Sequence, residues 1–232
     1  MNRTWLRGPA AVLFPDICVC CWREPVSRRQ PVCPFCLEDR FEEADPDVAR
    51  GTVGDFLPEG VILRYALWKY DKGGSLQELL YRVKYGGMEG VACQFGERLA
   101  HRLRPHSVLR RLNPSRLLLL PVPLHPARLR LRGYNQAERI ARGMQRTWAL
   151  PVADPETVRR TRNTRSQTGM TLPERISNLE QAFDVRRPEL LRGRTVLLVD
   201  DVFTTGATAF SLSTCLLKAG ARQTAVVTVA RA

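Results

Sequence analysis

The sequence predicts an α/β protein built on an open parallel sheet, preceded by a small cysteine-rich unit. Three short apolar runs indicate buried strands: RLLLLPVP from Arg116, TVLLVD from Thr195 and TAVVTVA from Thr224. Unbroken apolar runs are typical of strands that are covered on both faces, and segments with helical periodicity lie between these three. Two C-x-x-C pairs near the N-terminus indicate the additional unit.

The cysteines of this N-terminal unit favour one zinc site. The two pairs consist of Cys18, Cys21, Cys33 and Cys36. Each pair brings two thiolates to one ion from a tight turn, and four thiolates complete a tetrahedral zinc site. Two disulfides are the alternative, but the unpaired Cys20 and the lack of a recognisable export signal argue against them. We assign residues 1–45 to a zinc ribbon or knuckle, with Cys20 outside the ligand set.

The segment after the cysteines reads as a domain boundary followed by one strand and two helices. Residues 46–60 contain acidic residues, Pro and Gly and are expected to connect the cysteine unit to a larger domain over 61–232. VILRYALWKY then reads as a strand or hairpin arm. SLQELLYRVKY reads as a helix with Ser75 as its N-cap and Glu78 completing a capping box. A second helix is expected over about 89–103.

The second half of the chain alternates strands with helices. The run RLLLLPVP is followed by the helical pattern NQAERIARGMQRTW, and TVLLVD is followed by TGATAFSLSTCLLKAG, which ends at Gly220. Between these two units lies RRTRNTRSQTGMTLPERISN, which has few core residues and reads as a loop or a short helix. The alternation predicts a right-handed βαβ arrangement.

The charge of the chain is concentrated in its middle. The net charge is +13, and only four of the 36 basic residues are lysine. Sixteen arginines but only three carboxylates lie between Arg98 and Arg165, so this stretch holds an excess equal to that of the whole chain. Such a distribution indicates a phosphate-bearing partner, either a small polyphosphate or a nucleic-acid backbone. A highly soluble surface is the alternative.

The segment VLLVDDVFTTGAT, 196–208, carries the strongest chemical pattern. Burying unpaired carboxylates costs several kcal/mol, so Asp200 and Asp201 should face a cation, sugar hydroxyls, or both. TTGAT then begins a helix whose first amides lack intrahelical partners and can hold a phosphate, and Gly206 allows close approach of the backbone. Neither a Walker motif nor G-x-G-x-x-G occurs in the chain. The pattern therefore predicts a ribose-phosphate site.

The same segment resembles the 5-phosphoribosyl 1-pyrophosphate (PRPP) motif of type I phosphoribosyltransferases. The wider sequence resembles the ComF/ComFC family of competence-associated proteins through YALWKYDKGGSLQELLYRVKYGG, PVPLHPARLRLRGYNQAERIA and SQTGMTLPERISNLEQAF, in the same order. The resemblance covers nearly the whole chain. It implies the type I phosphoribosyltransferase fold, an open parallel sheet flanked by helices and carrying a hood.

The resemblance also implies two possible functions. One is a phosphoribosyltransferase, a pentosyl-transferring glycosyltransferase that moves ribose 5-phosphate from PRPP to an unknown acceptor with loss of pyrophosphate. The other is a non-catalytic factor that senses PRPP or handles single-stranded DNA during competence and DNA uptake. The expected partners are therefore PRPP and, in the second case, single-stranded DNA and competence proteins.

The resemblance assigns roles to individual residues. The carboxylates of Asp200 and Asp201 would hold the ribose hydroxyls. The residues expected around the 5-phosphate are Thr204, Thr205, Gly206, Ala207 and Thr208, and Val202 is also expected to contact PRPP. The loop expected at the pyrophosphate with Mg²⁺ is Pro121, Val122 and Pro123, closely followed by Arg128 and Arg132. A flexible catalytic loop would contribute Arg162 and Arg165. Asp200, Asp201, Arg132 and Arg165 are the expected catalytic residues.

Two further residues allow two interpretations each. His125 could donate to a phosphate or act as a general acid, or it could shape the loop between two prolines. Lys84 could serve the site, or it could be a helix-end lysine favoured by the helix dipole. No run of about 20 apolar residues is present, so no membrane span is expected and a cytoplasmic location is predicted.

Overall fold

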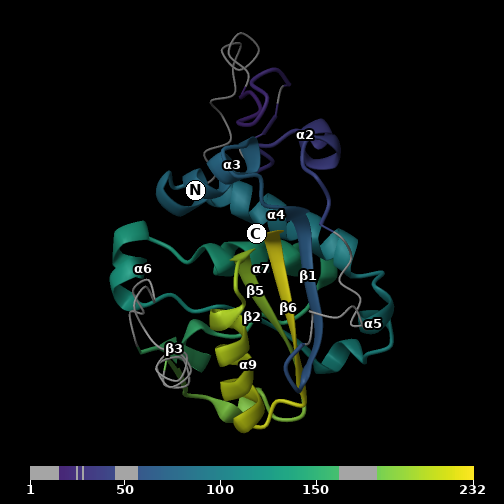
Figure 1. Ribbon diagram of the computed structural model, residues 1–232, viewed down its shortest axis with the longest axis vertical. Helices are drawn as coiled ribbons and strands as arrows, with labels where there is room; N and C mark the ends of the chain where they lie inside the picture. The colour runs from purple at the N-terminus through teal and green to yellow at the C-terminus, as the bar shows by residue number, and fades with distance from the viewer. Residues whose placement is uncertain (1–15, 25, 28, 45–56, 162–181) are drawn as a thin grey trace, which may run out of the picture.

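A four-stranded parallel sheet forms the centre of the molecule (Figure 1). The structure is a computed structural model that describes residues 16–24, 26–27, 29–44, 57–161 and 182–232. The sheet has the order β1-β6-β5-β2, and its strands are β1 (Val61–Lys69), β2 (Leu117–Pro121), β5 (Thr195–Phe203) and β6 (Gln223–Arg231). The predicted open parallel sheet is confirmed. The segment expected as a strand or hairpin arm is β1, an edge strand parallel to β6.

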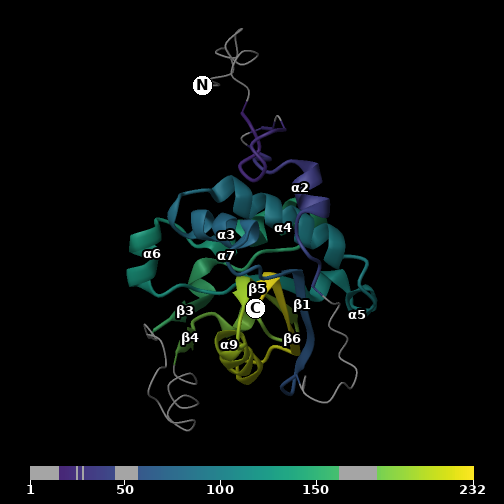
Figure 2. The same ribbon diagram turned by 45° about the horizontal axis from the view of Figure 1, so that its top comes forward.

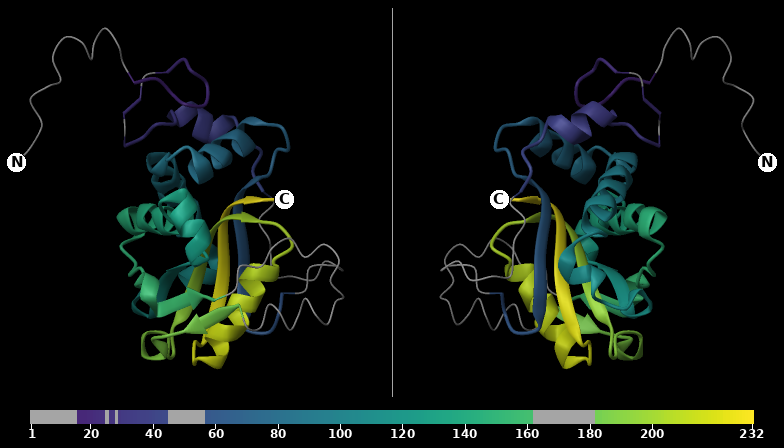
Figure 3. Two further views of the ribbon diagram at one scale, coloured as in Figure 1. Left: turned by 90° about the vertical axis from the view of Figure 1, so that its left-hand side faces the viewer. Right: turned by 90° about the vertical axis from the view of Figure 1, so that its right-hand side faces the viewer.

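Helices lie on both faces of this sheet, as the side views in Figure 3 show. The described helices are α2 (Pro34–Asp39), α3 (Ser75–Tyr85), α4 (Glu89–Leu103), α5 (Ser107–Arg110), α6 (Pro126–Arg132), α7 (Gln136–Trp148) and α9 (Ala207–Lys218). Short 3-10 turns occur at Pro114–Arg116, Pro155–Thr157 and Pro188–Leu190. An antiparallel pair, β3 (Val158–Arg160) and β4 (Phe183–Val185), lies outside the main sheet.

Alternate residues of the strands pack into two separate apolar cores. In β5, Leu197 and Val199 belong to the core that contains α4 and α7, whereas Val196 and Leu198 belong to the core that contains α9. This division follows from the two-residue period of a strand, which sends successive side chains to opposite faces. The unbroken apolar runs in the sequence therefore reflect coverage on both sides.

The two helices on one face, α4 and α7, are in direct backbone contact through two glycines. A Cβ atom added at Gly96 would lie 1.9 Å from the carbonyl oxygen of Ile140, and one at Gly143 would lie 1.9 Å from that of Cys93. Any side chain larger than hydrogen at either position would collide with backbone, which cannot move aside as a flexible side chain can. The two glycines fix the spacing between α4 and α7.

The cysteine unit packs onto the same helices and shares their core. Figure 2 shows it next to α3 and α4. The amide of Gln94, a buried α4 residue, accepts from Val32 N at 2.9 Å and donates to Val32 O at 2.6 Å. Cys18, Cys33 and Cys36 belong to the same buried cluster as the α4 and α7 residues. The unit is therefore held to the larger domain by apolar packing and by a two-bond amide pair.

The start of α3 differs from the expected capping box. Its N-cap is Gly74, which has no side chain that could accept a hydrogen bond from the first amides of the helix. Asp71 performs this function: its Oδ2 accepts from Leu76 N at 3.0 Å and its Oδ1 from Gln77 N at 2.8 Å. A carboxylate just before the helix satisfies two open amides at once and complements the helix dipole, so Ser75 is not needed as the cap.

Two further predictions from the sequence concern the domain boundaries and membrane spans. The connector predicted over 46–60 falls mostly outside the described residues, so the domain boundaries stay predictions. Across the described part of the chain, every helix is too short or too polar to cross a membrane.

Candidate functional site

The four cysteines predicted as metal ligands are assembled in one place. Their sulfur atoms all lie within 4.8 Å of one another, and the Cys18–Cys36 and Cys21–Cys33 sulfur pairs are each 3.9 Å apart. Zinc–sulfur bonds of about 2.3 Å in tetrahedral geometry place sulfurs about 3.8 Å apart. The four sulfurs can therefore bind a metal ion such as zinc. Cys20 is outside this set, as expected, and its backbone N–H donates to the Cys18 sulfur at 3.4 Å.

Backbone amides support the arrangement of these sulfurs. Cys33 N donates to the Cys18 sulfur at 3.3 Å, and Cys36 N donates to the Cys33 sulfur at 3.5 Å. The second of these bonds caps the short helix α2, whose N-cap residue is Cys33. Donors directed at sulfur favour its thiolate form, which is the form that binds metal.

The acidic pair lies near the carboxyl end of β5, a central strand of the sheet. Ligands bind in this position in open α/β sheets. The strand continues through both aspartates to Phe203, further than the apolar run alone indicated, because Asp200, Val202 and Phe203 all pair with β6. Asp201 is buried, and one of its carboxylate oxygens, Oδ2, lies 3.0 Å from Lys84 Nζ.

Burial and the neighbouring charge make Asp200 difficult to ionise. Desolvation, followed by the Asp201 carboxylate, raises the pKa of Asp200 to about 7. A hydrogen bond from Asp201 N to Asp200 Oδ1, at 2.9 Å, and the charges of Lys84 and Arg160 act in the opposite direction. A carboxyl group with this pKa can change protonation when a ligand or a cation arrives.

A left-handed glycine turn joins the acidic strand to α9. Gly206 has φ 77° and is the N-cap of α9, and an added Cβ would meet the rings of Phe210 at 2.5 Å and Phe203 at 2.6 Å. As a glycine, Gly206 has no side chain with which to cap the helix. Thr204 and Thr205 are exposed on the turn, and Thr205 Oγ1 accepts a long bond, 3.5 Å, from Ala207 N. The turn thus combines exposed hydroxyls with a helix N-terminus, the donor set that anions prefer.

The loop after β2 lies beside the acidic strand. Pro121 is paired with Val199, the residue before Asp200, and Val122 N donates to Val199 O at 2.9 Å. The carbonyl of Val122 accepts from the side-chain amide of Asn135 at 3.1 Å. The structure therefore brings the predicted pyrophosphate loop and the predicted ribose carboxylates to adjacent strand ends.

A cleft of about 590 Å³ opens next to this loop. Its wall combines the loop after β2 with the strip 153–161, and its charged lining includes Arg159, Arg160 and Arg186. His125 also lines it, but His125 is the N-cap of α6 and its Nδ1 accepts from Ala127 N at 3.2 Å. This hydrogen bond supports the loop-shaping interpretation of His125.

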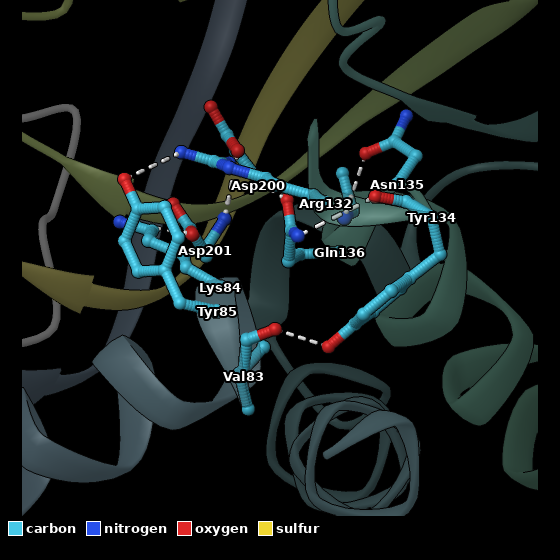
Figure 4. Close-up of polar contacts among 10 residues, drawn as sticks. Val83, Lys84, Tyr85, Arg132, Tyr134, Asn135, Gln136, Asp200 and Asp201 are labelled. Atoms are coloured by element: carbon cyan, nitrogen blue, oxygen red, sulfur yellow. Dashed lines mark hydrogen bonds and ion pairs between the residues drawn. The ribbon is translucent and has the colours of Figure 1, made fainter. Parts of the chain in front are cut away.

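Three residues from the end of α3 reach the other side of the acidic pair (Figure 4). The buried Tyr134 donates its hydroxyl to the carbonyl of Val83. Arg132 contacts Tyr85 twice, with its guanidinium 5.2 Å from the ring centre and its Nη2 3.4 Å from the hydroxyl. Arg132 Nη1 also donates to Gln136 Oε1 at 2.8 Å.

The predicted arginines are distributed unevenly around this site. Arg132 joins the cluster in Figure 4 through Tyr85, and Arg128 on α6 is close enough to Arg160 for the two charges to interact. Arg162 and Arg165 lie outside the described residues.

Sequence reasoning did not single out three residues that shape the site. Arg160 has no distinguishing local pattern, since it is one of many arginines in its segment. Asn135 and Tyr134 were identified only as parts of RGYNQAE. The N-cap preference of asparagine before a helical pattern was a usable signal for Asn135, whose Oδ1 accepts from Ala137 N at 3.1 Å.

Comparison with known proteins finds competence proteins and DNA utilization proteins. The chain is 38% identical over 116 residues to competence protein F of Haemophilus influenzae, covering 49% of this chain and about half, 50%, of that protein. It is 27% identical over 215 residues to competence protein ComFC of Bacillus subtilis, covering 90% and 82% of the two chains. DNA utilization protein YhgH of Escherichia coli K12 is 35% identical over 155 residues, 65% of each chain.

No protein-family model matches the chain. The relatives nevertheless agree with one another in kind, and the ComFC alignment extends over most of both proteins. The chain therefore has homologues among the competence proteins F and ComFC and the DNA utilization proteins YhgH.

Proposed function

We propose that this protein binds PRPP and transfers its ribose 5-phosphate to an acceptor, releasing pyrophosphate. The observation that carries the proposal is the placement of Asp200 and Asp201 near the end of a central parallel strand, directly before the Gly206 turn and α9. This order supplies acceptors for ribose hydroxyls followed by donors for a phosphate.

In the proposed reaction, the bond from ribose C1 to the pyrophosphate oxygen breaks and a bond from C1 to the acceptor forms. The pyrophosphate leaves with the electron pair of the broken bond, and the ribose passes through an oxocarbenium-like state, as in glycoside cleavage. The acidic pair would stabilise the positive ribose. The loop 121–123 and the arginines of the cleft, including Arg160, would stabilise the negative leaving group by fixed electrostatics.

Two metal ions belong to this proposal. Zinc would be held by Cys18, Cys21, Cys33 and Cys36, where it would contribute local folding free energy. Mg²⁺ would supply charge neutralisation at the pyrophosphate when bound with PRPP, using mainly phosphate oxygens and water as ligands.

The test is PRPP binding with Mg²⁺, together with pyrophosphate release in the presence of candidate acceptors. The double variant D200N/D201N keeps side-chain size but removes the charge, and turnover should fall by at least about 100-fold. Thr214→Ala, on the same helix α9 but away from its N-terminus, is the control that should retain activity. Near-parental binding and turnover in D200N/D201N would refute the assignment.

A second candidate function is supported by the names of the relatives and by the arginine-rich middle. Relatives are named competence proteins and DNA utilization proteins. We infer for this chain a role in competence or DNA uptake, with PRPP sensing and single-stranded DNA handling in place of catalysis. A parent protein that binds PRPP but releases no pyrophosphate with any acceptor in a cell extract would favour this second function.

A further inference from the structure

The last turn of α3 makes three contacts around the acidic pair with three consecutive residues (Figure 4). The Val83 carbonyl accepts from Tyr134, the Lys84 ammonium pairs with Asp201, and Tyr85 lies against Arg132. These partners come from two separate parts of the chain, the end of α6 with the residues that follow it and the end of β5. The end of α3 therefore joins the two parts of the proposed PRPP site.

The Val83 contact gives a carbonyl at the end of a helix its hydrogen-bond donor. The last four carbonyls of a helix have no intrahelical partner, and a buried one needs another donor. Tyr134 is well suited, because its burial is the main cause that raises the pKa of its phenol to about 12 and so keeps the donor proton in place. Asn135 follows directly and holds the carbonyl of Val122 in the loop after β2.

The Lys84 contact is more enclosed than an ordinary surface ion pair. Its ammonium lies 3.0 Å from Asp201 Oδ2, and the two side chains are only 26% and 11% exposed. A lysine that merely complemented the helix dipole would remain in solvent, as the exposed Lys218 does in the last turn of α9. The charged groups around the carboxylate are Lys84, Asp200 and, next to Asp200, Arg160, with Tyr134 nearby.

We propose that Lys84 is a positioning residue of the PRPP site, which fixes the Asp201 carboxylate toward the ribose. Two adjacent carboxylates repel each other, and an ammonium 3.0 Å from Asp201 Oδ2 holds that carboxylate in one orientation beside Asp200. This inference deepens the proposed function and depends on it only for the ligand-binding part of the test.

The test compares the parent with K84M, K84R and the matched helix-end control K218M. The carboxyl carbon signals of the aspartates are followed by NMR without ligand. At one fixed pH near neutrality, the carboxyl signal of Asp201 in K84M should move away from its parental position, because the ammonium 3.0 Å from its Oδ2 is gone. K84R should restore most of the parental position, and K218M should leave it unchanged. An Asp201 signal that is the same in the parent and in K84M would overturn the proposal.

PRPP binding with Mg²⁺ gives the second measurement. K84M should weaken binding about 10-fold or more, K84R should recover part of the loss, and K218M should bind as the parent does. Parental binding by K84M, or equal losses in K84M and K84R, would overturn the proposal. A parent that binds no PRPP would refute the proposed function, while the Asp201 carboxyl signal would still test the role of Lys84.

If K84M fails to fold, D201N examines the same pair from the other side. Removing the carboxylate charge should move the Nζ signal of Lys84 in the nitrogen NMR spectrum, because the ion pair no longer forms. An unchanged Lys84 signal in D201N would overturn the proposal.

Discussion

The stability of this protein should depend on pH through one carboxyl group, Asp200. Its pKa rises from 3.8 to about 7 in the folded state, because burial and the Asp201 charge both disfavour the ionised form. A raised carboxyl pKa means that the folded state holds the proton more tightly than the unfolded state does. The contribution of Asp200 to stability is therefore fully present below about pH 3.8 and is lost as the pH rises to 7.

The size of this effect follows from the shift. Each pH unit between the folded and unfolded pKa corresponds to about 1.4 kcal/mol, so the whole shift is on the order of 4 kcal/mol. Between pH 4.5 and pH 8, where unfolding can be measured conveniently, about 3 kcal/mol of this remains. The variant D200N cannot ionise and should lack this part of the pH dependence.

Urea unfolding of the parent and of D200N at several pH values measures the difference. The free energy of unfolding of D200N minus that of the parent should increase by about 3 kcal/mol from pH 4.5 to pH 8. V202A, two residues along the same strand, removes no titrating group and should lower stability equally at each pH. Parallel pH curves for the parent and D200N would refute the reasoning, since Asp200 would then titrate alike in both states.

Two further predictions concern the metal site and the arginines. Protein purified under reducing conditions should contain about one zinc per chain by elemental analysis, and protein without zinc would contradict the assignment. Chelation should lower the melting temperature of the whole protein, because the cysteines share the core of α4 and α7. If the arginine-rich middle binds single-stranded DNA, the plot of log affinity against log salt should become shallower by about 0.7 for each phosphate that a variant can no longer bind. The triple variant Arg104/Arg110/Arg111→Gln should show this change, whereas the charge-matched control Arg187/Arg192/Arg222→Gln should not, and equal slopes for the two would exclude a special role of the first three.

The sheet was predictable from the sequence because its strands are buried on both faces. The apolar runs that form β2, β5 and β6 leave no ambiguity about burial, and the period of NQAERIARGMQRTW identifies α7. The acidic pair was predictable for the opposite reason, since two adjacent carboxylates after such a run require a partner.

The contacts made across the chain were not predictable from local patterns. Lys84 and Asp201 are far apart in the sequence, and a lysine at a helix end is common for reasons of the dipole alone. The cap of α3 was wrongly assigned to Ser75, because Asp71 reaches the same amides from a turn outside the usual spacing. Arg160 enters the cleft only through the placement of β3.

The glycine contact between α4 and α7 has a consequence for the position of the loop after β2. Asn135 caps α7 and also holds the carbonyl of Val122, so the position of the loop after β2 depends on the position of α7. Gly96 and Gly143 set that position by direct backbone contact between α4 and α7. Exchange of either glycine for alanine would push α7 outward and carry the loop with it. The geometry of the loop after β2 therefore depends on two residues in the interior that do not belong to the loop.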